Sequence, residues 1–342
     1  MSEQAQSSGG QDHIEYFLED IAYQGKSERT REAYDRVLHD FREYLDSRDL
    51  AIDEANHRDC MAYIHQLRGA VAESTVATYA SYLNRFYDYM IRVDAFEDNP
   101  MSIVVEEIDE TIDTDPTRRD ISVPEMRSFV AALSHPLDRV VIVTLLKTGM
   151  RAGELCNLDT RDLFLAGSGI ASAEGHRPRL DGRPNSLFVD DAPQAGSMYN
   201  GQRRTASNKR KRATTIPVDE ELRTALETWL QVRPDPVSEA DPLFLSTGDS
   251  WGQRLTPDMV HHVVERHARE FGWYHDQGGP EENVTPHYFR HFFTTHLRDR
   301  TGDRGVVKYL RGDVATDVID TYTHDWGDRI RTVYRENIYS IA

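Results

Sequence analysis

The sequence predicts a mainly α-helical protein with one small antiparallel β-sheet. Apolar residues recur at three- and four-residue spacing through most of residues 12–100, as amphipathic helices require. In the second half of the chain, three short β-prone runs (RDLFL, NSLFVDD and RATTIPVD) lie between helical segments. With 342 residues, the chain is long enough for two or three domains that each bury a core.

The N-terminal part predicts a polar tail over residues 1–11 and a helical bundle over residues 12–100. Four segments carry the helical spacing, and the second has Thr30 as a cap candidate: IEYFLEDIAYQ, SERTREAYDRVLHDFREYLDSR, HRDCMAYIHQLRG and AESTVATYASYLNRFYDYMIRV. Four or five amphipathic helices in this length make a small bundle. Asn99-Pro100 predicts its end, because the residue before proline resists helix.

Residues 101–120 predict an interdomain linker, because they are acidic, contain proline and lack a helical period. Residues 121–342 then predict a second domain. It begins with a helix capped at Ser122 and continues with a buried helix that breaks at Gly149. The β-prone runs follow, separated by two Gly- and Pro-containing insertions, and the chain returns to helix after Val218.

The composition is strongly acidic, with a net charge of −18. Acidic residues are spread along the chain, and nearly all cations are arginine, since the lysines are Lys26, Lys147, Lys209, Lys211 and Lys308. This pattern is typical of a halophile's protein; the alternative is an acidic mesophilic protein whose partner is not DNA. A polar N-terminus, no apolar run of membrane-spanning length and two unrelated cysteines predict a reduced, cytoplasmic protein without zinc or membrane contact.

Two motifs place arginines on predicted helices. In TGMRAGEL, Arg151 follows the helix-breaking Gly149, and Glu154 lies on the same helical face. An arginine in this position can fork two phosphate oxygens, although an Arg–Glu surface pair is the alternative. In TPHYFRHFFTTHL, His287 and Arg290 lie one turn apart, while phenylalanines anchor the helix in the core; the alternative is a pair of exposed polar residues.

A third segment, SNKRKRATTIPVD, is a cationic turn that enters a strand. Such a turn can carry a lysine to a phosphate or to a leaving oxygen. The alternative is a solvated basic loop.

Together with Tyr322 in DTYTH, these segments resemble the tyrosine recombinases of the phage-integrase family, most closely the Xer-like and haloarchaeal integrases. The resemblance covers about residues 12–340. It implies an N-terminal, SAM-like core-binding domain and a C-terminal catalytic domain that gathers the separate motifs around one DNA phosphate. It also implies double-stranded DNA as the partner, a homotetramer on that DNA, and no metal or other cofactor.

The resemblance also implies roles for individual residues. Arg151 and Arg290 would bind the phosphate and His287 would assist them, while Glu154 would support Arg151. Lys209, with Lys211 as the second choice, would protonate the departing 5′ oxygen. Tyr322 would attack the phosphodiester to give a 3′-phosphotyrosine and a free 5′-hydroxyl.

One position departs from the family. Many relatives have histidine, or sometimes tryptophan, in a Leu-Gly-His segment before the tyrosine, but this chain has LRGD, with Asp313 there. An ionised carboxylate cannot donate a hydrogen bond to phosphate, so Asp313 is expected to orient Arg290 or Tyr322 instead.

Two other functions stay open at this level: a type IB topoisomerase-like relaxing enzyme, and a catalytically weakened DNA-binding protein. Tyr309, Tyr334 and Tyr339 lie in apolar helical patterns and predict packing residues. The last helix is expected to dock either on its own domain or on a neighbouring protomer. The segments GQRRTASNKRKR and RPRLDGRP are expected to line the DNA-facing surface with arginine.

Overall fold

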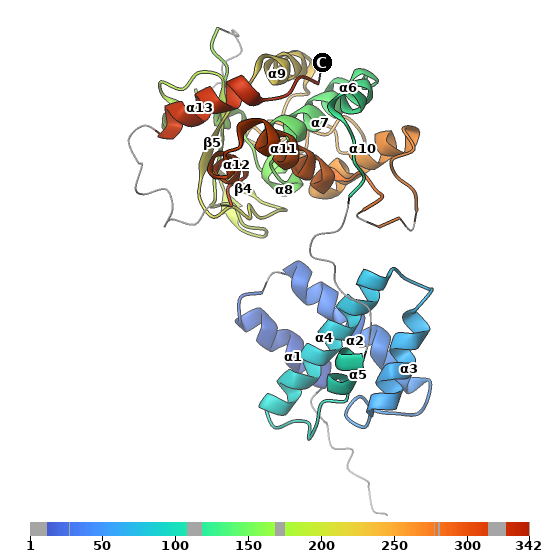
Figure 1. Ribbon diagram of the computed structural model, residues 1–342. Helices are drawn as coiled ribbons and strands as arrows, with labels where there is room; N and C mark the ends of the chain where they lie inside the picture. Colours follow the sequence, from blue (N-terminus) through green and yellow to red (C-terminus); the bar gives the residue numbers. More distant parts are fainter. Residues whose placement is uncertain are drawn as a thin grey trace, which may run out of the picture. The chain divides into compact units, whose positions relative to one another are not determined.

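The chain forms two compact units, residues 1–116 and residues 117–342, in a computed structural model (Figure 1). The structure describes residues 12–26, 28–107, 118–167, 175–276, 278–279, 281–313 and 326–341.

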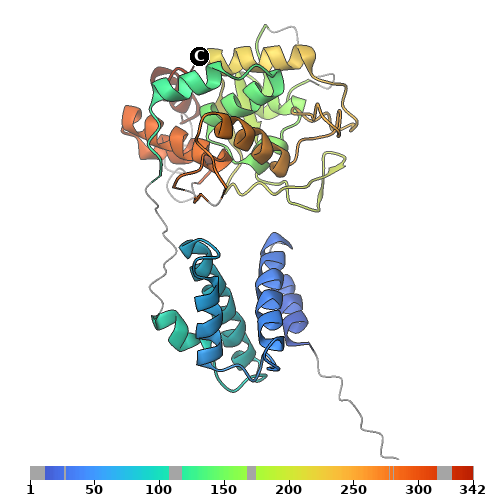
Figure 2. The same cartoon turned by 90° about the vertical axis from the view of Figure 1, so that its right-hand side faces the viewer.

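The first unit is a bundle of helices. Its elements are α1 (His13–Tyr23), α2 (Glu28–Asp46), α3 (His57–Leu67), α4 (Glu73–Arg92) and α5 (Met101–Glu107). Figure 2 shows α1 and α2 lying side by side as a pair, and α3, α4 and α5 as a second group. Asp12 caps α1 and Asn56 caps α3 with side-chain oxygens. Thr30 lies inside α2, so its prediction as a cap was wrong.

Aromatic side chains fill the core of this bundle. Phe17 packs edge-to-face on Tyr34 and on Phe86, with ring centroids 5.4 Å apart in both pairs. Tyr87 is buried between the helices, and its hydroxyl donates a hydrogen bond to the Ile52 carbonyl at 2.7 Å. The apolar face of each predicted helix therefore supplies the core, as its spacing indicated.

The prediction of irregular structure from residue 101 was wrong for residues 101–107. These residues form α5, which packs on α3 and α4 and buries Met101 and Val104. A helix of seven residues has only about two turns, which is too short to show a clear apolar period in the sequence.

The second unit is also mainly helical. Its helices are α6 (Val123–Ala131), α7 (Pro136–Thr148), α8 (Ala152–Cys156), α9 (Glu220–Val232), α10 (Pro257–Glu270), α11 (Pro286–Thr301), α12 (Arg304–Arg311) and α13 (Trp326–Asn337). Helix α7 lies at the centre, is buried over nearly its whole length, and packs against α9 and α11.

Local signals fix several helix ends as predicted. Ser122 and Glu125 form a capping box at the start of α6. Gly149 ends α7 in the left-handed region, with φ of 62°. Thr285 precedes α11, and Pro286 occupies its first turn.

A three-stranded antiparallel sheet joins β1 (Leu163–Phe164), β2 (Ser186–Val189) and β5 (Thr214–Pro217) in the order β1-β2-β5. Leu187 pairs with Leu163 on one side and with Ile216 on the other. The predicted fold class, mainly α with a small antiparallel sheet, is confirmed, and the strands coincide with the three β-prone runs.

A second, two-stranded ribbon was not predicted. It pairs β3 (Met198–Tyr199) with β4 (Gln202–Arg203). Asn200 and Gly201 connect the strands with φ of 49° and 73°, the pair of positive values that a tight type I′ hairpin turn needs.

The C-terminal residues pack on their own unit, where α13 lies beside α11 and β5 (Figure 1). Tyr309, Tyr334 and Tyr339 are buried, as their apolar patterns predicted. The buried ammonium group of Lys147 holds the end of the chain by donating to the Tyr339 carbonyl at 2.5 Å. Within the part of the chain that the structure describes, no helix is long and apolar enough to cross a membrane.

Candidate active site

Arg151 is held at the start of α8 by Glu154. The Glu154 carboxylate accepts from the Arg151 backbone N–H at 3.0 Å and from its Nη1 at 2.9 Å. Glu154 is fully buried, and its second ionic partner is Arg210, whose Nη2 lies 3.2 Å from Oε2. Since a buried carboxylate between two guanidinium groups has little freedom, Arg151 is fixed in direction.

Arg290 on α11 is almost completely buried, with 2% of its side chain exposed. Its Nη1 donates to the Gly149 carbonyl at 2.7 Å, and both terminal nitrogens donate to the Arg311 carbonyl. Burial, together with the nearby charges of Arg151 and Arg311, lowers the pKa of Arg290 to about 10. The guanidinium group therefore stays protonated at neutral pH, and the cluster of positive charges around it would attract an added anion.

Asp313 joins the two arginines. Its Oδ1 lies 3.2 Å from Arg151 Nη2 and 2.7 Å from Arg290 Nη2, and its Oδ2 lies 2.8 Å from Arg311 Nε. Residues from α8, α11 and the end of α12 thus meet around a single carboxylate. The expected contact of Asp313 with Arg290 is present, and the contact with Arg151 is an addition.

Lys209 lies in an irregular loop that is fixed by its neighbours. The side chains of Asn208 and Arg210 are buried, while Lys209 is exposed. Asn208 bonds to Asn157 at 2.8 Å, and Arg210 donates to the Leu310 carbonyl at 3.1 Å. The Lys209 carbonyl accepts from Arg151 Nη1 at 3.4 Å, so the loop that carries this lysine borders the arginine pair.

His287 precedes Arg290 by one turn on α11 and is exposed. Partial burial of its ring and the positive charges of Arg118, Arg290 and Arg151 lower the pKa of His287 to about 4. The imidazole is therefore neutral at neutral pH and can donate one hydrogen bond while accepting another. A bound phosphate would oppose this positive field.

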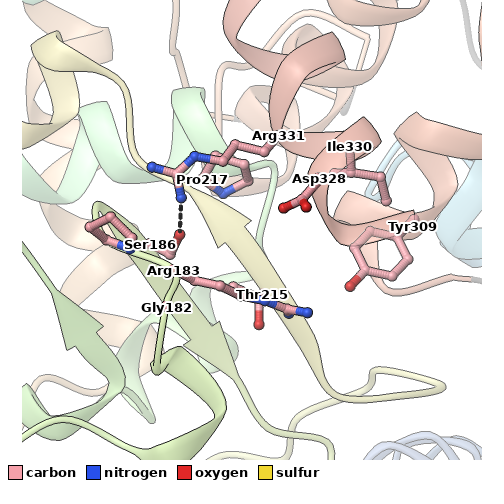
Figure 3. Close-up of a pocket in the computed structure, with 10 residues that line it drawn as sticks. Gly182, Arg183, Ser186, Thr215, Pro217, Tyr309, Asp328, Ile330 and Arg331 are labelled. Carbon is pink, nitrogen blue, oxygen red and sulfur yellow. Dashed lines mark hydrogen bonds between the residues drawn. The ribbon is translucent and has the colours of Figure 1, made fainter. Parts of the chain in front are cut away.

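Tyr322 lies outside the described residues. The helices before and after residues 314–325, α12 and α13, form one wall of a cavity of about 280 Å³ whose other wall is the sheet (Figure 3). In this cavity Arg331 donates to the Ser186 hydroxyl at 3.5 Å, as the dashed line in Figure 3 marks. Tyr309 and Asp328 project from the two helices into the same space.

The expected arginine-lined surface is only partly present. Arg204 and Arg210 of the first predicted segment are buried, and Arg204 pairs with Asp159 at 2.8 Å. Arg177 of the second segment pairs with Asp162 and with Asp190 at 3.3 Å. These three arginines are paired with carboxylates inside the fold, so their charges are not available to DNA. Arg203, Lys209, Lys211, Arg179 and Arg183 remain exposed.

Sequence reasoning missed three residues that shape the site. Arg210 is the buried partner of Glu154, and Arg311 is the third partner of Asp313. Gly312 has φ of 71°, and a Cβ there would lie 2.6 Å from Arg210 Nη1. The glycine before Asp313 was a usable signal, whereas nothing local marks Arg210 as buried.

Two family models match the chain. The model of the phage integrase N-terminal SAM-like domain matches residues 14–93, and the model of the phage integrase family matches residues 194–327. The chain belongs to the phage integrase family of tyrosine recombinases.

Curated relatives match nearly the full length of the chain. It is 25% identical to tyrosine recombinase XerC of Pelotomaculum thermopropionicum, over 95% of this chain and 97% of the relative. It is 26% identical to tyrosine recombinase XerD of Listeria innocua, again over 95% and 97%.

Solved structures share the fold. The Tn1549 transposon integrase in complex with transposon right end DNA matches with a TM-score of 0.63 at 20% identity, over 94% of this chain and 98% of that one. A lambda integrase dimer bound to a COC′ core site matches with a TM-score of 0.61 at 14% identity, over 88% and 93%. The arrangement of a SAM-like domain followed by an integrase catalytic domain, predicted from sequence, is thereby confirmed.

Proposed function

We propose that the protein is a site-specific DNA recombinase that cuts and rejoins DNA through a 3′-phosphotyrosine, without metal or ATP. The observation that carries the proposal is the meeting of Arg151 and Arg290, from separate helices, at one anionic oxygen. Two rigid guanidinium groups aimed at one point suit the non-bridging oxygens of a phosphodiester. The curated relatives named above are recombinases, which favours strand exchange over simple relaxation of supercoils.

Each residue has a role that its surroundings support. Arg151 and Arg290 stabilise the charge that builds on the phosphate, and removing one such donor typically lowers the rate about 10²–10³-fold. Neutral His287 donates to the phosphate or accepts a proton near it. Lys209 is exposed in the loop beside Arg151 and would protonate the departing 5′ oxygen. Tyr322 supplies the nucleophilic hydroxyl, whose ordinary pKa near 10 makes this assistance necessary.

The remaining assignments follow from the same proposal. Residues 12–100 form the core-binding domain and residues 121–342 the catalytic domain, which together hold double-stranded DNA. Lambda integrase, a fold neighbour, has been solved as a tetramer bound to a Holliday junction. A homotetramer on DNA is accordingly the proposed working assembly, in the cytoplasm of a halophile whose high salt suits the charge of −18.

A covalent-adduct assay on random DNA tests the proposal whatever the target sequence is. A library of random duplexes, each nicked a few nucleotides 3′ of a candidate cleavage position, lets the short 5′-hydroxyl fragment diffuse away and traps the adduct. Covalent species are isolated on denaturing gels, and their DNA is sequenced. We expect an adduct from the unmodified chain and none from Tyr322→Phe.

Tyr274→Phe is the matched control. The Arg269 guanidinium carbon lies 4.7 Å from the centroid of the Tyr274 ring, and a phenylalanine keeps that ring. We expect this variant to form the adduct at the normal rate. An adduct that persists in Tyr322→Phe, or one that maps to Tyr309 or Tyr334, would refute the proposal.

A further inference from the structure

We propose that Asp313 is an internal competitor of the scissile phosphate, whose carboxylate occupies the anion position between Arg151 and Arg290 until DNA displaces it. The inference rests on the proposed function, because it concerns the same two arginines. It assigns Asp313 an effect opposite in sign to that of a phosphate-binding residue.

The geometry of the carboxylate carries the first step. A single oxygen, Oδ1, is shared by Arg151 Nη2 at 3.2 Å and Arg290 Nη2 at 2.7 Å. Carboxylates and phosphates present oxygens of similar spacing to a guanidinium fork, so both anions fit the same donors. A phosphate oxygen and Oδ1 cannot occupy this point together, and their like charges would repel at any shorter approach.

The arginines do not need Asp313 to hold their positions. Arg290 is anchored by the carbonyls of Gly149 and Arg311, and Arg151 is anchored by the buried Glu154. Removing the Asp313 charge would therefore leave two fixed, positively charged donors with one anion fewer. That arrangement raises the attraction for an added oxyanion.

Asp313 can also rotate away from the point between Arg151 and Arg290. It follows Gly312 at the end of α12, and 27% of its side chain is exposed. Its second oxygen is already held by Arg311 Nε at 2.8 Å. A small rotation can keep the Arg311 contact while it frees the point between Arg151 and Arg290. The carboxylate then moves, while Glu154 holds Arg151 and the Gly149 and Arg311 carbonyls hold Arg290.

The alternative is that Asp313 positions the arginines, and it predicts the opposite result. If the carboxylate orients the guanidinium groups for phosphate, its neutralisation weakens phosphate binding. If the carboxylate competes with phosphate, its neutralisation strengthens binding. Isosteric Asp313→Asn and truncating Asp313→Ala both remove the charge, and only asparagine adds a new N–H donor.

Inorganic phosphate, titrated by calorimetry into the full chain without DNA, tests the inference. All variants carry Tyr322→Phe, so the measurement is independent of DNA cleavage, and chloride keeps the ionic strength constant. Because charge-assisted hydrogen bonds to both arginines are released, we expect Asp313→Asn and Asp313→Ala to bind phosphate about tenfold more tightly or better.

Two controls locate the effect. Asp299→Asn removes one exposed negative charge of α11 whose ion-pair partner is the adjacent Arg298, and it should leave phosphate affinity unchanged. Arg151→Gln combined with Asp313→Asn should abolish the gain, because it removes one of the two donors. Thermal unfolding of each variant confirms that the compared proteins are folded.

The inference is overturned by equal or weaker phosphate binding in the Asp313 variants, by binding in none of the proteins, by a gain confined to asparagine, or by a gain that survives Arg151→Gln. Its failure is separate from that of the proposed function. A chain that forms the Tyr322 adduct without the phosphate gain loses only the inference, whereas a phosphate gain without an adduct leaves an anion site and removes the recombinase proposal.

Discussion

Replacing Gly149 with alanine should destabilise the catalytic unit, because this glycine is required twice. Its φ of 62° lies in the left-handed region, which costs a non-glycine residue about 1–2 kcal/mol. An added Cβ would also lie 2.3 Å from Phe293 Cδ1, about 1.2 Å closer than the ~3.5 Å contact of carbon atoms. Phe293 is fully buried, so its ring cannot leave, and overpacking of this kind costs about 1–3 kcal/mol.

The sum predicts a loss of about 2–5 kcal/mol in the free energy of unfolding for Gly149→Ala. Gly302→Ala separates the two contributions. Gly302 ends α11 with φ of 64°, but a Cβ there would meet nothing within 4 Å. Gly302→Ala should therefore lose only the backbone contribution of about 1–2 kcal/mol.

Urea unfolding followed by tryptophan fluorescence measures this difference in the full chain. All four tryptophans lie after residue 116, so the signal reports the second unit alone. Gly149 also accepts a hydrogen bond from Arg290, so a displaced α11 should slow adduct formation by about 10²-fold. The reasoning is refuted if Gly149→Ala is no less stable than Gly302→Ala at equal m-values.

Two further predictions concern charge. The pKa of His287 is lowered to about 4 in the folded chain, whereas an unfolded histidine has a pKa near 6.5, so protonation favours unfolding as pH falls from about 6.5 toward 4. Over this range the urea midpoint should drop less in His287→Gln than in the unmodified chain. His262→Gln, at an exposed histidine, is the control and should behave like the unmodified chain. Lys147→Met removes the buried ammonium group that lies 2.7 Å from Asp219 and 2.6 Å from Glu221. We expect it to cost about 3–5 kcal/mol in urea unfolding and to speed hydrogen exchange of residues 338–341, and an unchanged exchange rate would contradict the tethering of the chain end.

Features with short-range causes were predictable from sequence. The capping box at Ser122, the break at Gly149 and the start of α11 at Thr285 each depend on residues within one turn. The hairpin at Asn200-Gly201 has an equally local cause and could have been found, but its strands are too short to show alternation. The helix over Met101–Glu107 was not predicted for the same reason, because it is too short to show a period.

Features with long-range causes were not predictable from local patterns. Arg210 lies in an irregular segment without periodicity, and its burial depends on Glu154, more than fifty residues earlier. The bridging position of Asp313 depends on where α8 and α11 place their arginines. The family resemblance named the arginines correctly as neighbours, yet it could not describe Asp313, because the departure has no counterpart in the pattern.

The net charge of −18 argued against a DNA partner, but it says little about the site. Three carboxylates there and in the adjoining buried network each serve two or three guanidinium groups. The ionic partners are Glu154 with Arg151 and Arg210, Asp159 with Arg204 and Arg254, and Asp313 with Arg151, Arg290 and Arg311. Six arginines against three carboxylates leave three formal positive charges among these described residues. Exposed charges are screened within about 8 Å at physiological salt, and buried charges are screened much less. The local positive excess, rather than the net charge of the chain, therefore determines that the site attracts an anion.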